Sequence, residues 1–212
     1  MSSIEELVED TIESFCFDFI ESPYLCYTEH GLHALFYHRL LTDLSINERC
    51  IEVDGKGSNR KRICMVQKEY PMAEKRKKDS KRAHWDIAVL NSEQKVDSKK
   101  WYDRLKLNSV EEFGLNEKMD HVSDDISRIC FNQHNGSIQN GFVVHLYRFS
   151  KSISGRDWQN RHKGYALPGD IRKKIGRKQN LVAYWLFIDG ETGKKRGPFR
   201  IDCRGCRRVM AK

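Results

Sequence analysis

The chain has 212 residues, of which 39% are hydrophobic and 32% charged, a balance that predicts one folded domain over residues 1–212 and excludes a disordered tail. Its 38 Lys and Arg against 30 Asp and Glu give a net charge of +8, which favours an anionic partner, nucleic acid before others. No apolar run approaches the roughly 18 residues that span a bilayer, and the acidic start MSSIEELVED is unlike a secretory signal. We therefore expect a cytoplasmic protein without a membrane partner, and the odd count of seven cysteines favours reduced thiols.

The first fifty residues are predicted to be helical. Apolar residues recur at helical spacing from Ile4 to Phe19, and the pair Ser22-Pro23 ends this pattern. Thr28 is a suitable N-cap for a second helix, which ends near Asn47. Two helices are therefore expected ahead of any strand.

The pattern then changes from helical to extended. Residues 50–53 and 63–67 are short strand candidates, and the turn pair Asp54-Gly55 between them favours a hairpin. Residues 74–82 form a basic run without apolar spacing, which predicts an exposed loop. The stretch HWDIAVLN, residues 84–91, returns to a strand pattern and is apolar enough to be buried on both faces.

The rest of the chain alternates between strands and helices. The predicted elements are, in order, a strand at 105–115, an amphipathic helix at 119–131, a strand at 141–149, a helix around Pro168 to Ile175, a strand at 180–189 and a final hairpin that turns at 191–194. Together they predict an α/β fold in which helices flank a mixed central β-sheet. The first helix and the C-terminal β-hairpin are additions to this core.

Three carboxylates stand where a metal site could form. Asp86 lies at the start of the DIAVL strand and Glu112 near the end of VEEFGL, so both side chains meet at one rim if these strands are neighbours. Glu29 lies in the first turn of the helix ahead of the sheet. Mg²⁺ or Mn²⁺ takes hard oxygen ligands and leaves positions for water and phosphate, so this arrangement predicts a site for one or two metal ions.

The segments YTEHGLHALFYHRL, HWDIAVL, VEEFGL and MDHVSDDISRI, in this order, resemble the PD-(D/E)xK nuclease superfamily. The resemblance covers about residues 27–149 and implies a restriction-endonuclease-like core with the element order αβββαβ, which residues 150–212 extend. It implies that Asp86 and Glu112 bind Mg²⁺ or Mn²⁺ together with the backbone carbonyl of Phe113, and that Glu29 assists. In this superfamily the metal activates a water that attacks a phosphodiester, and a lysine orients that water.

The chain departs from the pattern of the superfamily at two positions. Trp85 stands where the motif has a proline, which contributes no chemistry there. Gly114 stands where the motif has its lysine, and glycine supplies neither a charge nor a side-chain donor. Lys118, just inside the next predicted helix, could reach back toward the same rim and supply the missing charge.

Two other registers of the motif remain open. Asp97-Ser98-Lys99 spells D-x-K eleven residues after Asp86, but its segment SEQKVDSKK has only one apolar residue to anchor it in a sheet. Glu112 is favoured because its strand is better anchored. Glu111, on the opposite side of the same strand, is the second alternative.

Six basic residues precede Asp86 and are expected to contact the phosphates of a nucleic acid, with a solvated loop as the other interpretation. They are Lys75, Arg76, Lys77, Lys78, Lys81 and Arg82. The sequence thus predicts a metal-dependent nuclease acting on DNA, within a larger complex for defence or mobile-element biology. The alternatives are a catalytically silent relative that binds nucleic acid or a protein partner, and a purely structural subunit.

Overall fold

The computed structural model describes residues 3–43, 51–54, 61–75, 82–94, 96–97, 105–149, 165–177 and 180–210. Its helices are α1 (Ile4–Glu21), α2 (Glu29–Thr42), α4 (Met119–His134) and α7 (Pro168–Ile175). Its strands are β1 (Ile51–Asp54), β2 (Lys61–Ile63), β3 (Val66–Lys75), β4 (Arg82–Leu90), β5 (Val96–Asp97), β6 (Leu107–Leu115), β7 (Ile138–Phe149), β8 (Leu181–Asp189), β9 (Lys195–Ile201) and β10 (Cys206–Arg208). None of the helices in this part of the chain is long and apolar enough to cross a membrane.

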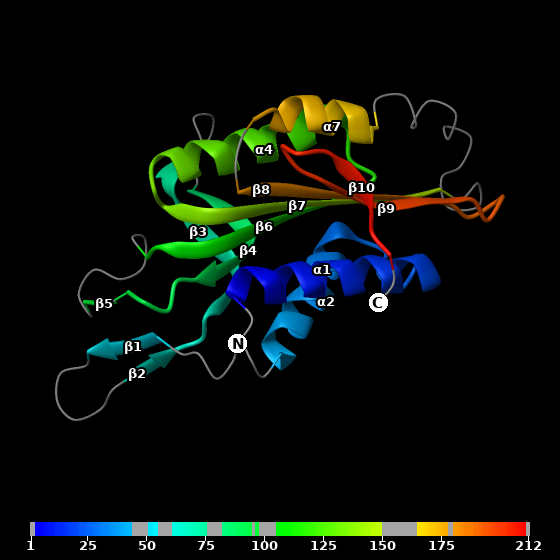
Figure 1. Cartoon of the computed structure of the whole chain (residues 1–212). Helices are drawn as coiled ribbons and strands as arrows, with labels where there is room; N and C mark the ends of the chain where they lie inside the picture. Colours follow the sequence, from blue (N-terminus) through cyan, green and yellow to red (C-terminus); the bar gives the residue numbers. More distant parts are fainter. Residues whose placement is uncertain are drawn as a thin grey trace.

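Seven strands form the central sheet in the order β10-β9-β8-β7-β6-β4-β3. β6, β7 and β8 run parallel to one another, and the other neighbours are antiparallel. Figure 1 shows α4 and α7 over one face of the sheet and α1 and α2 over the other. The predicted fold class, a mixed central sheet flanked by helices, is therefore confirmed.

Aromatic packing fixes β6 against the two N-terminal helices. The ring of Phe113 in β6 lies with its centroid 6.0 Å from that of Phe15 in α1 and 5.0 Å from that of Phe36 in α2. All three side chains are buried, and aromatic pairs at this spacing stabilise a core beyond the area that they bury. The α1 residues that face the sheet recur at helical spacing, as the sequence predicted.

A smaller sheet has the strand order β2-β1-β5. β1 and β2 are antiparallel with Ile51 opposite Ile63, so the predicted hairpin forms. The predicted strand over 63–67 is wrong, because the chain leaves the small sheet after Ile63 and enters β3 of the large sheet at Val66. Buried Met65, whose carbonyl accepts a hydrogen bond from the N–H of Leu90 at 2.8 Å, ties this change of sheet to β4.

Candidate active site

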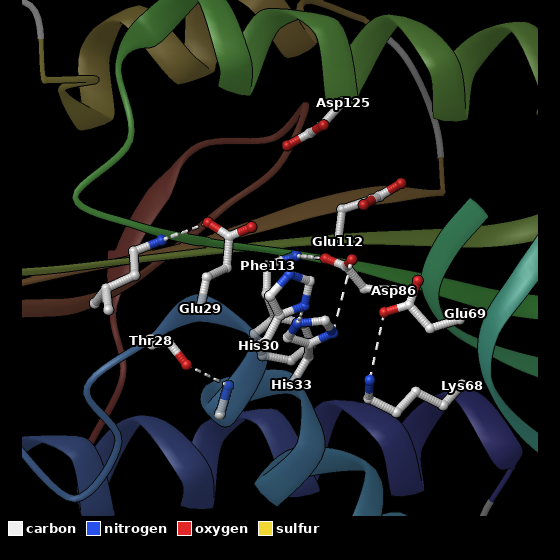
Figure 2. Close-up of polar contacts among 12 residues, drawn as sticks. Thr28, Glu29, His30, His33, Lys68, Glu69, Asp86, Glu112, Phe113 and Asp125 are labelled. Carbon is white, nitrogen blue, oxygen red and sulfur yellow. Dashed lines mark hydrogen bonds and ion pairs between the residues drawn. The ribbon is translucent and has the colours of Figure 1, made fainter. Parts of the chain in front are cut away.

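Two carboxylates lie close together where β4 runs beside β6. These strands are antiparallel with Ile87 opposite Glu111, and continuing this register by one residue places Asp86 opposite Glu112. Asp86 Oδ2 accepts a hydrogen bond from the backbone N–H of Phe113 at 2.9 Å, which fixes this carboxylate against β6 (Figure 2). The fold thus brings together Asp86, Glu112 and the Phe113 backbone.

Burial dominates the electrostatics of Glu112, which is 4% exposed. Burial raises the pKa of its carboxyl well above the usual value, and the positive charge of Arg128 only partly opposes this effect. The negative charges of Asp125 and Asp86, and a hydrogen bond with the Asp86 carboxyl, raise the pKa further. A buried carboxyl group close to other acidic groups resists ionisation unless a cation lies beside it.

The donor set fits a hard divalent cation. Glu112 Oε1 is buried and accepts no hydrogen bond from any residue that the structure describes, although Arg128 Nη2 lies 3.2 Å away. Carboxylate and carbonyl oxygens, such as those of Asp86, Glu112 and Phe113, are the ligands that Mg²⁺ and Mn²⁺ prefer. A metal ion would coordinate this oxygen, which accepts no hydrogen bond from the described residues.

Glu29 lies at the same rim, at the first position of α2. Its Oε2 accepts a hydrogen bond from the backbone N–H of Leu115 at 3.3 Å, so it reaches the end of β6 (Figure 2). Burial raises the pKa of Glu29, the hydrogen bond from Leu115 lowers it, and the charges of Asp86 and Glu117 raise it again. Glu29 is therefore in electrostatic contact with Asp86.

Two histidines of α2, not predicted as site residues, flank Asp86. His33 is fully buried, and its Nδ1 lies 3.7 Å from Asp86 Oδ1. Its Nε2 shares a hydrogen bond of 2.9 Å with Nδ1 of His30, one turn earlier on the helix. Together with Glu69 of β3, these histidines place three possible ligand atoms within 4.8 Å of one another.

Arg128 of α4, also absent from the predicted site, connects two acidic groups. Its Nη2 contacts both Glu112 Oε1 and Asp125 Oδ1. Burial acts to raise the pKa of Asp125, but His145 and the charge of Arg128 hold this pKa below its usual value. The pKa of the Asp125 carboxyl is thus lowered, whereas that of the Glu112 carboxyl is raised.

The ring of His145 fills the space beside Gly114, where the sequence resemblance led us to expect a lysine. β6 and β7 are parallel with Gly114 beside His145, which is 1% exposed. A Cβ atom at Gly114 would lie 2.3 Å from both Cε1 and Nδ1 of this imidazole, closer than any real contact. Lys118 is the N-cap of α4, and its exposed side chain makes no hydrogen bond or ion pair with the described residues. The glycine is thus explained by the histidine on the next strand.

We expect Gly114→Ala to reduce the free energy of unfolding by about 1–3 kcal/mol, the usual cost of overpacking a core. In a His145→Ala background the same substitution should cost much less, because the imidazole is gone and only the flexible Glu117 side chain, 3.2 Å from the added Cβ, has to shift. Urea unfolding of the four proteins of this double-mutant cycle measures the difference. Gly169→Ala is a matched control, since a Cβ there meets nothing within 4 Å. Equal costs of Gly114→Ala in both backgrounds would contradict the explanation.

The remaining predicted residues lie apart from this rim or outside the described residues. Asp97 belongs to β5 and pairs with β1, so the competing D-x-K register falls in the small sheet. Glu111 is fully buried, and Ser109 Oγ donates a hydrogen bond to its Oε1 at 2.6 Å. The basic run connects β3 to β4, whose ends pair through the backbone at Lys75 and Arg82. Residues 76–81 of that run lie outside the described residues.

Comparisons with known proteins add one structural likeness. No protein-family model matches the chain, and no curated protein matches it. Among solved structures, the chain is similar to P. aeruginosa NucC in its cAAA-bound form, at 8% sequence identity and a TM-score of 0.38. The similarity covers 92% of this chain and 83% of the NucC chain. With identity this low, the chemistry has to be inferred from the residues of the chain itself.

Proposed function

We propose that the protein is a metal-dependent nuclease in which Asp86, Glu112 and the backbone carbonyl of Phe113 hold Mg²⁺ or Mn²⁺. The observation that carries this proposal is the pair of neighbouring carboxyl groups of Asp86 and Glu112, because Glu112 is buried and its Oε1 accepts no hydrogen bond from the described residues. Such a pair is costly for an apo protein, and a divalent cation removes the cost.

The residues around the pair have separate roles in this proposal. A bound divalent ion would polarise the phosphate and lower the pKa of a coordinated water. Asp86 is held in place by the Phe113 N–H, so its second oxygen stays directed toward the rim near His33. Glu29 adds negative charge at the end of β6, where it assists in holding the cation. Lys118, exposed at the start of α4, is free to approach a phosphate and supply the charge that Gly114 lacks.

The proposed substrate is DNA. The net charge of +8 and the basic residues from Lys75 to Arg82, between β3 and β4, favour a polyanion bound through its backbone phosphates. These basic residues precede or begin β4, which starts at Arg82, four residues before Asp86. We place such an enzyme in a larger complex for defence or mobile-element biology, because the described sheet and helices include no separate sequence-reading module.

Cleavage assays on the purified full chain test the proposal. We expect Mg²⁺ or Mn²⁺ to support cutting of single- or double-stranded DNA, and Asp86→Asn to reduce the rate by at least about a hundredfold, since even outer partners of metal ligands are worth 10–100-fold. Asp124→Asn, an exposed aspartate of α4, is the matched control and should cut normally. Unchanged cutting by Asp86→Asn would overturn the assigned site. Lys118→Ala, measured in the same assay, decides whether this lysine takes part.

One contact favours a second candidate, a catalytically silent protein of the same fold that binds nucleic acid or a protein partner. The guanidinium of Arg128 already lies against Glu112 and Asp125, so a built-in cation partly neutralises the acids. No cutting with either metal, combined with DNA binding that weakens steeply with salt, would identify this candidate. The absence of both activities would leave a structural subunit.

A further inference from the structure

A second group of potential metal ligands lies between α4 and β7. His121 and Asp125 are one turn apart on the same side of α4, and His145 faces them from β7. Their ligand atoms all lie within 4.8 Å of one another. We propose that His121, Asp125 and His145 form a binding site for a Zn²⁺ ion, separate from the metal position proposed for cleavage.

The distances within this group match a shared metal ion better than direct hydrogen bonds. Asp125 Oδ2 lies 3.4 Å from His145 Nε2 and 3.5 Å from His121 Nδ1. A charge-assisted hydrogen bond between these groups would be about 2.7–2.9 Å long. Ligands about 2.0–2.1 Å from a tetrahedral zinc ion lie about 3.3–3.4 Å apart, close to the two distances from Asp125 Oδ2.

The buried ligand atoms of this group lack hydrogen bonds within the described part of the chain. Asp125 and His145 have side chains that are each 1% exposed. Asp125 Oδ2 and His145 Nε2 make no hydrogen bond within the described part of the chain. Such atoms are costly to bury, and a metal ion satisfies them together. His121 is 44% exposed, so the ion has a path from solvent.

The neighbouring residues orient the two buried ligands. Arg128 contacts Asp125 through Oδ1, so the other oxygen, Oδ2, remains directed at the histidines. The imidazole of His145 occupies the space that Gly114 leaves open, and no residue with a Cβ fits there without moving it. Outer contacts that fix a ligand's orientation are typical of protein zinc sites. The glycine at the motif position thus has a role in this second site.

Three protein ligands of imidazole and carboxylate type suit Zn²⁺ and leave a fourth position for water. The ion would clamp α4 to β7. It would also hold Asp125 beside Arg128, whose other contact is Glu112. The Zn²⁺ site therefore does not depend on cleavage activity, and a protein that cuts no DNA would still bind this ion.

Direct measurement of Zn²⁺ binding tests the proposal on the purified full chain stripped of metal. We expect one equivalent of Zn²⁺ to bind by calorimetry and to raise the melting temperature, because the ion binds only the folded protein. His121→Ala and Asp125→Asn should each weaken Zn²⁺ binding by at least about a hundredfold, since they remove direct ligands. The exposure of His121 makes its replacement compatible with folding, which circular dichroism verifies.

Two histidine variants serve as matched controls. His134→Ala changes an exposed histidine of the same helix, and His30→Ala changes the other histidine group, near Asp86. Both proteins should bind Zn²⁺ like the natural chain. Absence of Zn²⁺ binding by the natural protein, or unchanged binding by His121→Ala, would overturn the proposal. Loss of binding in His30→Ala alone would place the ion at the other group and would overturn it equally.

Discussion

Replacing Glu112 with glutamine is expected to abolish metal-dependent cleavage and to stabilise the metal-free protein. Cleavage should fall by at least about a hundredfold, because the amide is a poor substitute for a carboxylate ligand. Stability should rise because burial, with Asp125 and Asp86 nearby, raises the pKa of Glu112 above its ordinary 4.5. The ionised form of Glu112 is thus disfavoured in the folded state. The free energy of unfolding of the natural protein therefore falls as pH rises above 4.5, the ordinary pKa of a glutamate. Glutamine carries no charge to lose.

Urea unfolding in the presence of a chelator measures the stability, and DNA cleavage with Mg²⁺ measures the activity. A lower cleavage rate together with a higher free energy of unfolding would show that Glu112 binds the metal but destabilises the metal-free fold. Glu93→Gln, in an exposed turn after β4, should change neither quantity. A Glu112→Gln protein that is less stable than the natural one at pH 7.5 would mean that pairing with Arg128 outweighs burial.

Local periodicity predicted the elements of the fold well where one face is apolar. The helix from Pro168 to Ile175 begins with proline and ends before a glycine, and α7 has these bounds. β3 was missed over most of its ten residues, because KEYPMAEK alternates poorly and includes a proline. Its place is set by pairing with β4, from Val66 opposite Val89 onward, which is a tertiary effect.

The carboxylates of the candidate site could be located from the sequence, whereas their neighbours could not. The motif resemblance drew attention to Asp86 and Glu112 at strand positions, so their proximity followed once the two strands were taken as neighbours. Arg128 looked like an ordinary polar position of an amphipathic helix. His145 lay in an apolar strand, where a buried histidine is usually part of the core. Its relation to Gly114 depends on the β6–β7 register, which no local pattern specifies.

Glu111→Gln is expected to make the protein's stability much less dependent on pH between about 4.5 and 8. Glu111 is fully buried, and burial raises its pKa from 4.5 to about 8, while the hydrogen bond from Ser109 lowers it only in part. In this window the folded state binds a proton that the unfolded chain releases, so the free energy of unfolding falls as pH rises. Each pH unit costs the natural protein about 1.4 kcal/mol through this group. The glutamine variant avoids that loss and still accepts the Ser109 hydrogen bond.

Urea unfolding at intervals between pH 5 and 9 measures the effect. The stability of Glu111→Gln relative to the natural protein should grow by about 1.4 kcal/mol per unit through pH 7 and level off above pH 8, where Glu111 ionises in both states. Glu21→Gln changes a glutamate whose side chain is 79% exposed and should follow the natural protein throughout. A constant difference between Glu111→Gln and the natural protein across this range would mean that Glu111 is already ionised at pH 5. Its buried carboxylate would then need a cationic partner on that face of β6.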